Sequence, residues 1–285
     1  MSHPSGCLYV VATPIGNLED LSARARRILG EVDLIAAEDT RHSARLLQHL
    51  GLHTRMVSLH QHNESAQTVE LLERLQRGQS IALISDAGTP LLSDPGFELV
   101  RAARAAGLPV YAVPGPSALV AALSVAGLPA DRFVFEGFLP HKPAARRRVL
   151  EGFARETRTV VCYESSHRIA EALDDVVAAL GGERRLALAR ELTKIHEQVV
   201  AGTAAELRDW LAADADRSLG EFVLLIAGAP EQRHADQITV TVDDLLKALL
   251  GAMSVSEAAR VAAGLSGLKK NALYERALQL QAQKS

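Results

Sequence analysis

Short apolar runs alternate with longer amphipathic segments through the first part of the chain. The apolar runs are rich in Val, Ile and Leu, as in buried strands, and lie at 8–12, 33–37, 55–59, 80–84 and 110–113. The segments between them repeat apolar residues with helical spacing at 21–29, 43–50, 66–77 and 97–106. Strands that alternate with helices predict a mostly parallel sheet with helices on both faces.

The same alternation resumes after the turn-forming sequence at residues 114–116. It predicts a helix at 117–126 and strands at 133–136, 159–163, 186–190, 197–200 and 222–227. Thr203 and Glu206 have capping-box spacing, which begins a helix that reaches Leu211. We therefore expect two α/β domains, at 1–114 and 115–229.

The pattern changes to short helices near the C-terminus. Residues 230–237 are polar and indicate a linker, and helical segments follow near 243–250, 254–263 and 269–281. Ser254 and Glu257 have capping-box spacing. This pattern predicts a small helix-turn-helix-like appendage at 241–285.

Composition narrows the classes of partner and compartment. Lys and Arg number 31 against 34 Asp and Glu, so the net charge is −3 and any nucleic-acid binding must depend on local basic clusters. The only cysteines, Cys7 and Cys162, are far apart, which disfavours a disulfide framework or a cysteine zinc site. With no secretory or membrane-spanning pattern, we expect a soluble cytoplasmic protein.

The run LISDAGTPLLSDPG, residues 83–96, follows a predicted buried strand and carries two Asp, two Pro and two Gly after Ser85. Open α/β sheets hold ligands at the carboxyl ends of their strands, so these residues predict a loop that cradles a ligand with exposed backbone. The alternative is an ordinary strand-to-helix turn. The standard motifs of dinucleotide folds, phosphate-loop NTPases, zincins and G-x-S-x-G hydrolases do not occur in the sequence.

Charged clusters follow several predicted strands. The cluster at 38–42 combines two carboxylates with Arg and His, which suits substrate binding or proton transfer, although helix capping explains it too. The clusters at 163–168 and 190–194 place charges at the same edge of the second sheet. Lys142 and three arginines begin a helix at Pro143, which indicates a phosphate site or else a solvated face.

Six segments together resemble the ribosomal RNA small subunit methyltransferase I family of the tetrapyrrole methylase superfamily. They are VATPIGNL (11–18), AEDTR (37–41), the 83–96 run, PGPSA (114–118), YES (163–165) and GEFV (220–223). They span nearly all of residues 7–229, and the 83–96 run is the most specific of them.

This resemblance implies a two-domain class III methyltransferase with S-adenosylmethionine in the interdomain cleft. It implies methylation of a cytidine 2′-hydroxyl in small-subunit (16S) ribosomal RNA, free or in the assembled subunit, by a homodimer. It also implies that the appended helices form a helix-turn-helix. The residues carried over to the cofactor site are Pro14, Asp86, Ala87, Gly88, Ser117, Ala118 and Ala227.

The catalytic and RNA-binding roles are our own hypotheses. Methyl transfer needs alignment and proton removal, and no metal is required. Asp39 or a neighbouring carboxylate accepts the hydroxyl proton, while Lys194 and Arg41 steer phosphate or stabilise the alkoxide. The predicted RNA contacts are Lys142, Arg146, Arg147, Arg148 and Arg168. Alternative functions are methylation of a tetrapyrrole or protein and a non-enzymatic RNA-binding assembly role.

Overall fold

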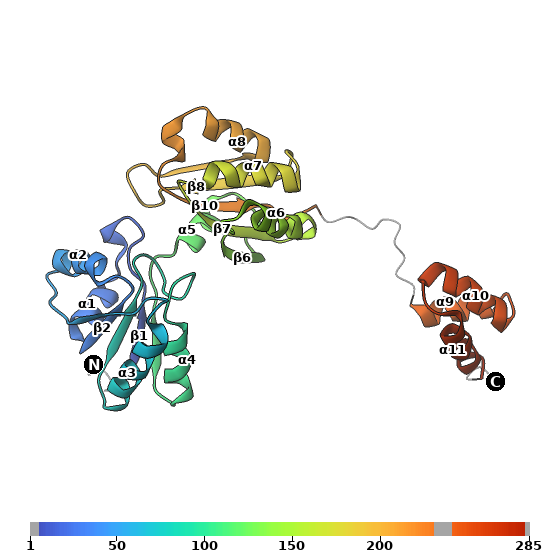
Figure 1. The fold of residues 1–285 in the computed structure, drawn as a ribbon, viewed down its shortest axis with the longest axis horizontal. Helices are drawn as coiled ribbons and strands as arrows, with labels where there is room; N and C mark the ends of the chain where they lie inside the picture. The colour runs from blue at the N-terminus through green and yellow to red at the C-terminus, as the bar shows by residue number, and fades with distance from the viewer. Residues whose placement is uncertain (1–5, 231–240, 283–285) are drawn as a thin grey trace. The chain divides into compact units, whose positions relative to one another are not determined.

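A computed structural model describes residues 6–230 and 241–282. The chain divides into two compact units, within Met1–Pro230 and within Glu231–Ser285, and the first unit contains two five-stranded sheets (Figure 1). The further division of the first unit near residue 114 stays a prediction. The predicted linker at 230–237 lies, apart from Pro230, outside the described residues.

The first sheet is parallel throughout, as predicted. Its strands are ordered β3-β2-β4-β1-β5, and their bounds are β1 Leu8–Val11, β2 Leu34–Ala37, β3 Met56–Ser58, β4 Ile81–Ile84 and β5 Val110–Val113. All residues of β2 and β4 are buried because helices cover both faces. The carboxyl ends of β1, β2 and β4 therefore lie next to one another at one edge.

Four helices cover this sheet, two on each face. They are α1 (Ala23–Glu31), α2 (Thr40–Leu50), α3 (Glu64–Gln76) and α4 (Phe97–Ala105), and a short 3-10 helix η1 (Leu18–Asp20) precedes α1. Residues of α1 and α2 share one apolar core, and residues of α3 and α4 share the other. Helix α2 begins three residues before its predicted start because the Asp39 side chain accepts a hydrogen bond from Arg41 N and caps it.

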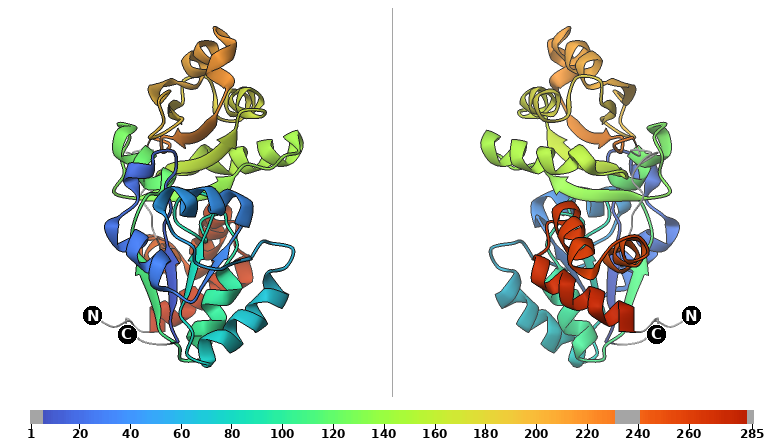
Figure 2. Two further views of the ribbon diagram at one scale, coloured as in Figure 1. Left: turned by 90° about the vertical axis from the view of Figure 1, so that its left-hand side faces the viewer. Right: turned by 90° about the vertical axis from the view of Figure 1, so that its right-hand side faces the viewer.

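The second sheet is mixed. Its order is β6-β7-β10-β8-β9, with bounds β6 Phe133–Phe138, β7 Thr159–Ser165, β8 Arg185–Arg190, β9 Gln198–Thr203 and β10 Glu221–Ile226. Only the β6–β7 pair is parallel. Strand β10 runs antiparallel between β7 and β8, so its first residues lie beside the last residues of both neighbours. Figure 2 shows the two sheets of this unit as separate layers.

Helices cover both faces of the second sheet as well. Helix α5 (Ala118–Val125) packs on one face, and α6 (Pro143–Gly152), α7 (Ile169–Leu180) and α8 (Ala204–Ala212) pack on the other. Two 3-10 helices, η2 (Phe153–Arg155) and η3 (Ala215–Ser218), follow α6 and α8. The predicted capping box of Thr203 and Glu206 begins α8.

The C-terminal unit is a cluster of three helices, α9 (Val242–Leu250), α10 (Val255–Ser266) and α11 (Lys270–Ala282). Its core contains Leu246, Ala259, Leu273, Ala277 and Leu280, and the predicted capping box of Ser254 and Glu257 begins α10. The predicted helical appendage is confirmed. No helix in the described part of the chain is long and apolar enough to cross a membrane.

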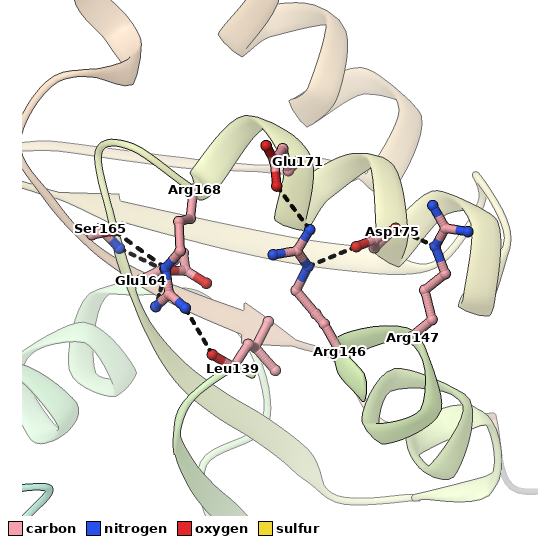
Figure 3. Close-up of polar contacts among 8 residues, drawn as sticks. All are labelled: Leu139, Arg146, Arg147, Glu164, Ser165, Arg168, Glu171 and Asp175. Atoms are coloured by element: carbon pink, nitrogen blue, oxygen red, sulfur yellow. Dashed lines mark hydrogen bonds and ion pairs between the residues drawn. The ribbon is translucent and has the colours of Figure 1, made fainter. Parts of the chain in front are cut away.

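Arg146 is buried, which corrects its predicted role as an RNA contact. Its side chain is 1% exposed, and its Nε and Nη2 donate to Asp175 and Glu171 of α7 at 2.6 and 3.1 Å (Figure 3). Arg147 pairs with the other Asp175 oxygen. Burial works to raise the pKa of Asp175, but hydrogen bonds from Arg147 and Arg146 outweigh it and lower that pKa. A negative charge is expected beside the cationic start of α6, and Asp175 and Glu171 of the same chain supply it.

Replacing Asp175 by Asn should destabilise the chain by about 3 to 5 kcal/mol, because Arg146 would keep its charge in the interior without its closest partner. Urea unfolding measures the change. The control is Glu73→Gln, which breaks the exposed pair with Arg77 and should cost at most about 1 kcal/mol. Equal costs for both variants would show that the buried pair has no special role.

Candidate active site

A cavity of about 440 Å³ lies where the carboxyl edge of the first sheet meets the second sheet. The loop after β4, the end of β2 and the start of α5 line it from one side, and β7, β8 and β10 line it from the other. Its volume is within the range of small-molecule sites in proteins, about 300–1,000 Å³. The cavity includes the predicted residues Asp86, Ala87, Gly88, Ser117, Ala118 and Lys194.

Two backbone hydrogen bonds shape the loop after β4. Thr13 N donates to Gly88 O at 2.9 Å, and Gly88 N donates to Thr13 O at 3.0 Å. Gly88 has φ +79°, and a Cβ there would lie 3.3 Å from Ile15 Cγ2. Leu91 and Ser93 also have positive φ angles, of 74° and 73°, which non-glycine residues adopt only when their surroundings hold them. This is a tightly constrained loop, and its residues line the cavity.

Three carboxylates lie in the wall of the cavity on the first-sheet side: Glu38, Asp86 and Asp94. Asp86 N donates to Glu38 Oε2 at 3.5 Å, which links the ends of β4 and β2. Burial, followed by the nearby carboxylates of Asp94 and Asp86, raises the pKa of Glu38. Burial also raises the pKa of Asp94. A raised pKa makes a carboxylate a better proton acceptor.

The hypothesis allowed Asp39 or a neighbouring carboxylate as proton acceptor, and the structure places Glu38 in the cavity wall and Asp39 outside it. Asp39 caps α2 and forms a two-point ion pair with Arg41, at 3.1 and 2.7 Å. That hydrogen bonding holds the pKa of Asp39 far below its usual range. The Arg41 side chain is 90% exposed. The sequence showed two adjacent carboxylates, and only backbone direction decides which one faces the cavity.

Lys194 enters the cavity between two carboxylates. Its Nζ donates to Glu191 Oε1 at 2.8 Å and to Glu221 Oε2 at 2.6 Å. Burial works to lower the pKa of Lys194, but these two hydrogen bonds outweigh it and raise the pKa. Lys194 is therefore a charged ammonium. Gly16 is required beside it, since a Cβ there would overlap Lys194 Cγ.

Glu221 was missed as a site residue by the sequence analysis. It is the first residue of β10, and it reaches this edge only because β10 runs antiparallel to β7 and β8. The same reversal places Ala227, a predicted cofactor residue, away from this cavity. Ala227 follows the other end of β10, where its N donates to Arg185 O at the start of β8, and it does not line the cavity.

The remaining predicted residues lie elsewhere. Pro14 lines a second cavity of about 170 Å³. Arg168 is mostly buried and pairs with Glu164, while its Nη1 donates to Leu139 O at 3.0 Å (Figure 3). It holds the end of β7 in place and so is not free to contact RNA. Lys142 and Arg148 are exposed.

Comparison with known proteins identifies the family. Residues 7–208 match the family described as Tetrapyrrole (Corrin/Porphyrin) Methylases, and residues 236–281 match the RsmI C-terminal HTH domain. Two solved structures share the fold of the first unit. Uroporphyrin-III-C-methyltransferase from Thermus thermophilus has a TM-score of 0.55 at 23% identity over 78% of this chain and 94% of that chain. The methyltransferase CobJ has a TM-score of 0.59 at 20% identity over 79% and 95%.

The chain belongs to the tetrapyrrole methylase family, whose methyltransferases use S-adenosylmethionine. Ribosomal RNA small subunit methyltransferase I of Pseudomonas aeruginosa is 52% identical over 97% of this chain and 98% of that protein. The protein of that name from Haemophilus influenzae is 49% identical over 96% of this chain and 97% of that protein. Within the family, the chain thus belongs to the group that carries this name, and the resemblance of its six segments is confirmed.

The cavity suits S-adenosylmethionine in size and in charge. The cofactor carries a sulfonium and an ammonium, and the wall that bears Glu38, Asp86 and Asp94 is acidic. Gly88, whose N and O are both hydrogen-bonded to Thr13, supplies the left-handed conformation that this loop adopts in the cavity wall. Among the described residues, no group of three or more His, Cys, Asp and Glu side chains is placed to hold a metal ion.

Replacing Gly88 by Ala should weaken S-adenosylmethionine binding at least about tenfold, because the new Cβ would lie 3.3 Å from Ile15 Cγ2 and either the loop or Ile15, which both line the cavity, must shift. Gly107→Ala is a matched control, because Gly107 has φ +72° and open space around its Cβ position. Both variants should lose about 1–2 kcal/mol of stability from the left-handed backbone. Calorimetric titration with the cofactor measures the difference, and equal affinities would contradict this role of the loop.

Proposed function

We propose that the chain transfers a methyl group from S-adenosylmethionine to the 2′-hydroxyl of a cytidine in small-subunit ribosomal RNA. The observation that carries the proposal is the acidic cavity, in which a carboxylate of raised pKa lies beside the constrained loop after β4. The names of the relatives, which match at about half identity over nearly their whole length, supply the class of substrate.

Asp86, Ala87 and Gly88, with Ser117 and Ala118 at the start of α5, are the proposed cofactor-binding residues. The bound cofactor supplies an already activated methyl group, so the protein contributes alignment and proton removal. The Thr13–Gly88 hydrogen bonds hold the loop after β4 in place. Backbone groups of this loop can therefore bind the cofactor without a side-chain rearrangement. Orientation of this kind can lower a barrier by about 7–11 kcal/mol.

Glu38 is the proposed acceptor of the hydroxyl proton. It lines the cavity next to Asp86, and burial raises its pKa toward the range in which a carboxylate is an effective base. Lys194 is the proposed ligand of a substrate anion. Its partner Glu221 is 78% exposed, so a substrate phosphate can displace that carboxylate from the Lys194 ammonium.

Lys142 and Arg148, exposed on α6 and its N-terminal flank, are the proposed RNA contacts of this unit. The net charge of −3 leaves RNA binding to such local clusters. Reversing both charges should weaken RNA binding and reduce its dependence on salt. Filter binding measures both effects. An unchanged salt dependence would show that the two residues belong to a solvated face of α6 and do not contact RNA.

A homodimer in the cytoplasm is the proposed state of the protein. Apolar side chains are exposed on the edge strands β5 and β6 and on α5, namely Tyr111, Phe133, Val120 and Val125. A second copy of the chain would cover them. Sedimentation of the full chain as a monomer would refute this. Both cysteines are buried thiols, which fits a reducing compartment.

Incubation of the purified chain with S-adenosylmethionine and small-subunit ribosomal RNA tests the proposal. We expect one 2′-O-methylated cytidine after nuclease digestion and mass spectrometry. Free RNA and assembled subunits, assayed in parallel, show which is the substrate. Methylation of a tetrapyrrole or a protein in place of RNA would favour the alternative substrates, and absence of cofactor binding would favour an assembly factor.

Glu38→Gln should lower kcat, measured at saturating cofactor, about 100- to 10,000-fold, the usual contribution of a general base. Asp39→Asn is the adjacent control and should stay within a few-fold of wild type, because Asp39 lies outside the cavity. In the wild type, kcat should fall as pH drops through the raised pKa of Glu38, since protonated Glu38 accepts no proton. A similar loss for both variants would remove Glu38 from this role.

A further inference from the structure

A second cavity, of about 170 Å³, lies against the first-sheet side of the active site. Residues of the loop after β1 and of η1 line it from one direction, and residues of α2 line it from another. Pro14, Leu18 and Leu46 provide an apolar lining, with His42 and Arg45 beside it. Pro14 was expected in the cofactor site from the family resemblance, but it does not line the first cavity, and the roles stated under the proposed function use none of these five residues.

Asp86 lines both cavities, so the two spaces are neighbours. The Thr13–Gly88 hydrogen bonds hold the loop after β1 against the loop after β4 at this point. Asp86 Oδ1 accepts from Asp39 N at 3.0 Å. Among the described residues, Oδ2 has no hydrogen-bond partner, and it can accept a bond from a ligand located between the cavities.

The volume indicates the kind of group that fits. It is below the range of about 300–1,000 Å³ for sites that hold a whole small ligand. It equals roughly five or six water molecules at about 30 Å³ each, which suits a single flat ring. The apolar side chains can contact the faces of such a ring. Arg45 and His42 can donate hydrogen bonds to acceptors on its edge.

We propose that this second cavity binds the pyrimidine base of the nucleotide to be methylated, an inference that depends on the proposed function. The ribose then lies beside Asp86, with its 2′-hydroxyl directed toward Glu38 in the first cavity. Binding of a target base in a pocket of its own is how enzymes and RNA-binding modules select unstacked nucleotides. The one-ring volume makes this cavity the element that disfavours purines.

The test fills the cavity. Leu18 is 45% exposed, so Leu18→Trp can place an indole over the opening without disturbing the core. We expect KM for an RNA fragment around the methylated nucleotide to rise roughly 10- to 100-fold, the usual effect of losing one base contact. The cofactor Kd should not change. Val69→Trp, on α3 and 61% exposed, is the matched control and should behave as wild type.

A second substrate makes the test specific for the base. The same RNA with an abasic target nucleotide, which keeps its 2′-hydroxyl, should raise KM of the wild type by a similar factor. It should raise KM of Leu18→Trp no further, because the pocket is already blocked. Replacing the target cytidine by a purine nucleotide should raise KM more than replacing it by uridine does.

The outcomes separate the two proposals. Normal methylation by Leu18→Trp, or an abasic substrate as good as the intact one, overturns the base pocket and leaves the proposed function standing. An abasic substrate that binds normally to the wild type but poorly to Arg45→Gln would assign the cavity to a phosphate instead and also overturns the base pocket. Absence of methyl transfer to any RNA overturns the proposed function and the base pocket with it.

Discussion

The paired hydrogen bonds between Thr13 and Gly88 are the interaction on which the active site depends. They join the loop after β1 to the loop after β4, although the two strands are more than seventy residues apart in the chain. Because β1 and β4 are neighbours in the parallel sheet, their carboxyl ends emerge side by side, and the loops can pair only there. The pairing uses both backbone polar groups of Gly88, and Asp86 beside it lines both cavities.

The antiparallel course of β10 supplies the opposite wall. A strand inserted in this direction between β7 and β8 brings its first residue, Glu221, to the edge at which they end. There Glu221 joins Glu191 in holding the Lys194 ammonium. The site consequently has two kinds of charge: carboxylates of raised pKa on the first-sheet side, and a charged lysine paired with two carboxylates on the second-sheet side. The first kind suits a cationic methyl donor and proton removal, and the second kind can respond to an anionic substrate.

Charge in the second sheet's helical layer serves a different purpose. The sequence predicts Arg146 and Arg168 as nucleic-acid contacts. In the structure both form ion pairs with carboxylates of the same chain, Asp175 and Glu164. A guanidinium with several fixed donors is well suited to such buried pairing. Arg147 is exposed but pairs with Asp175. Lys142 and Arg148 are exposed and form no ion pair within the described residues, so the basic surface available for RNA on this unit is smaller than the count of basic residues suggests.

The sequence by itself determined the order and type of nearly every helix and strand, the parallel first sheet and the loop of residues 83–96, because apolar periodicity and turn residues are local signals. It also determined the family, through six short segments. Only the tertiary structure decided that Glu38 and not Asp39 faces the cavity, that Glu221 reaches it and Ala227 does not, and that Arg146 is buried. These facts depend on strand direction and on partners distant in the chain, and neither is encoded in the spacing of nearby residues.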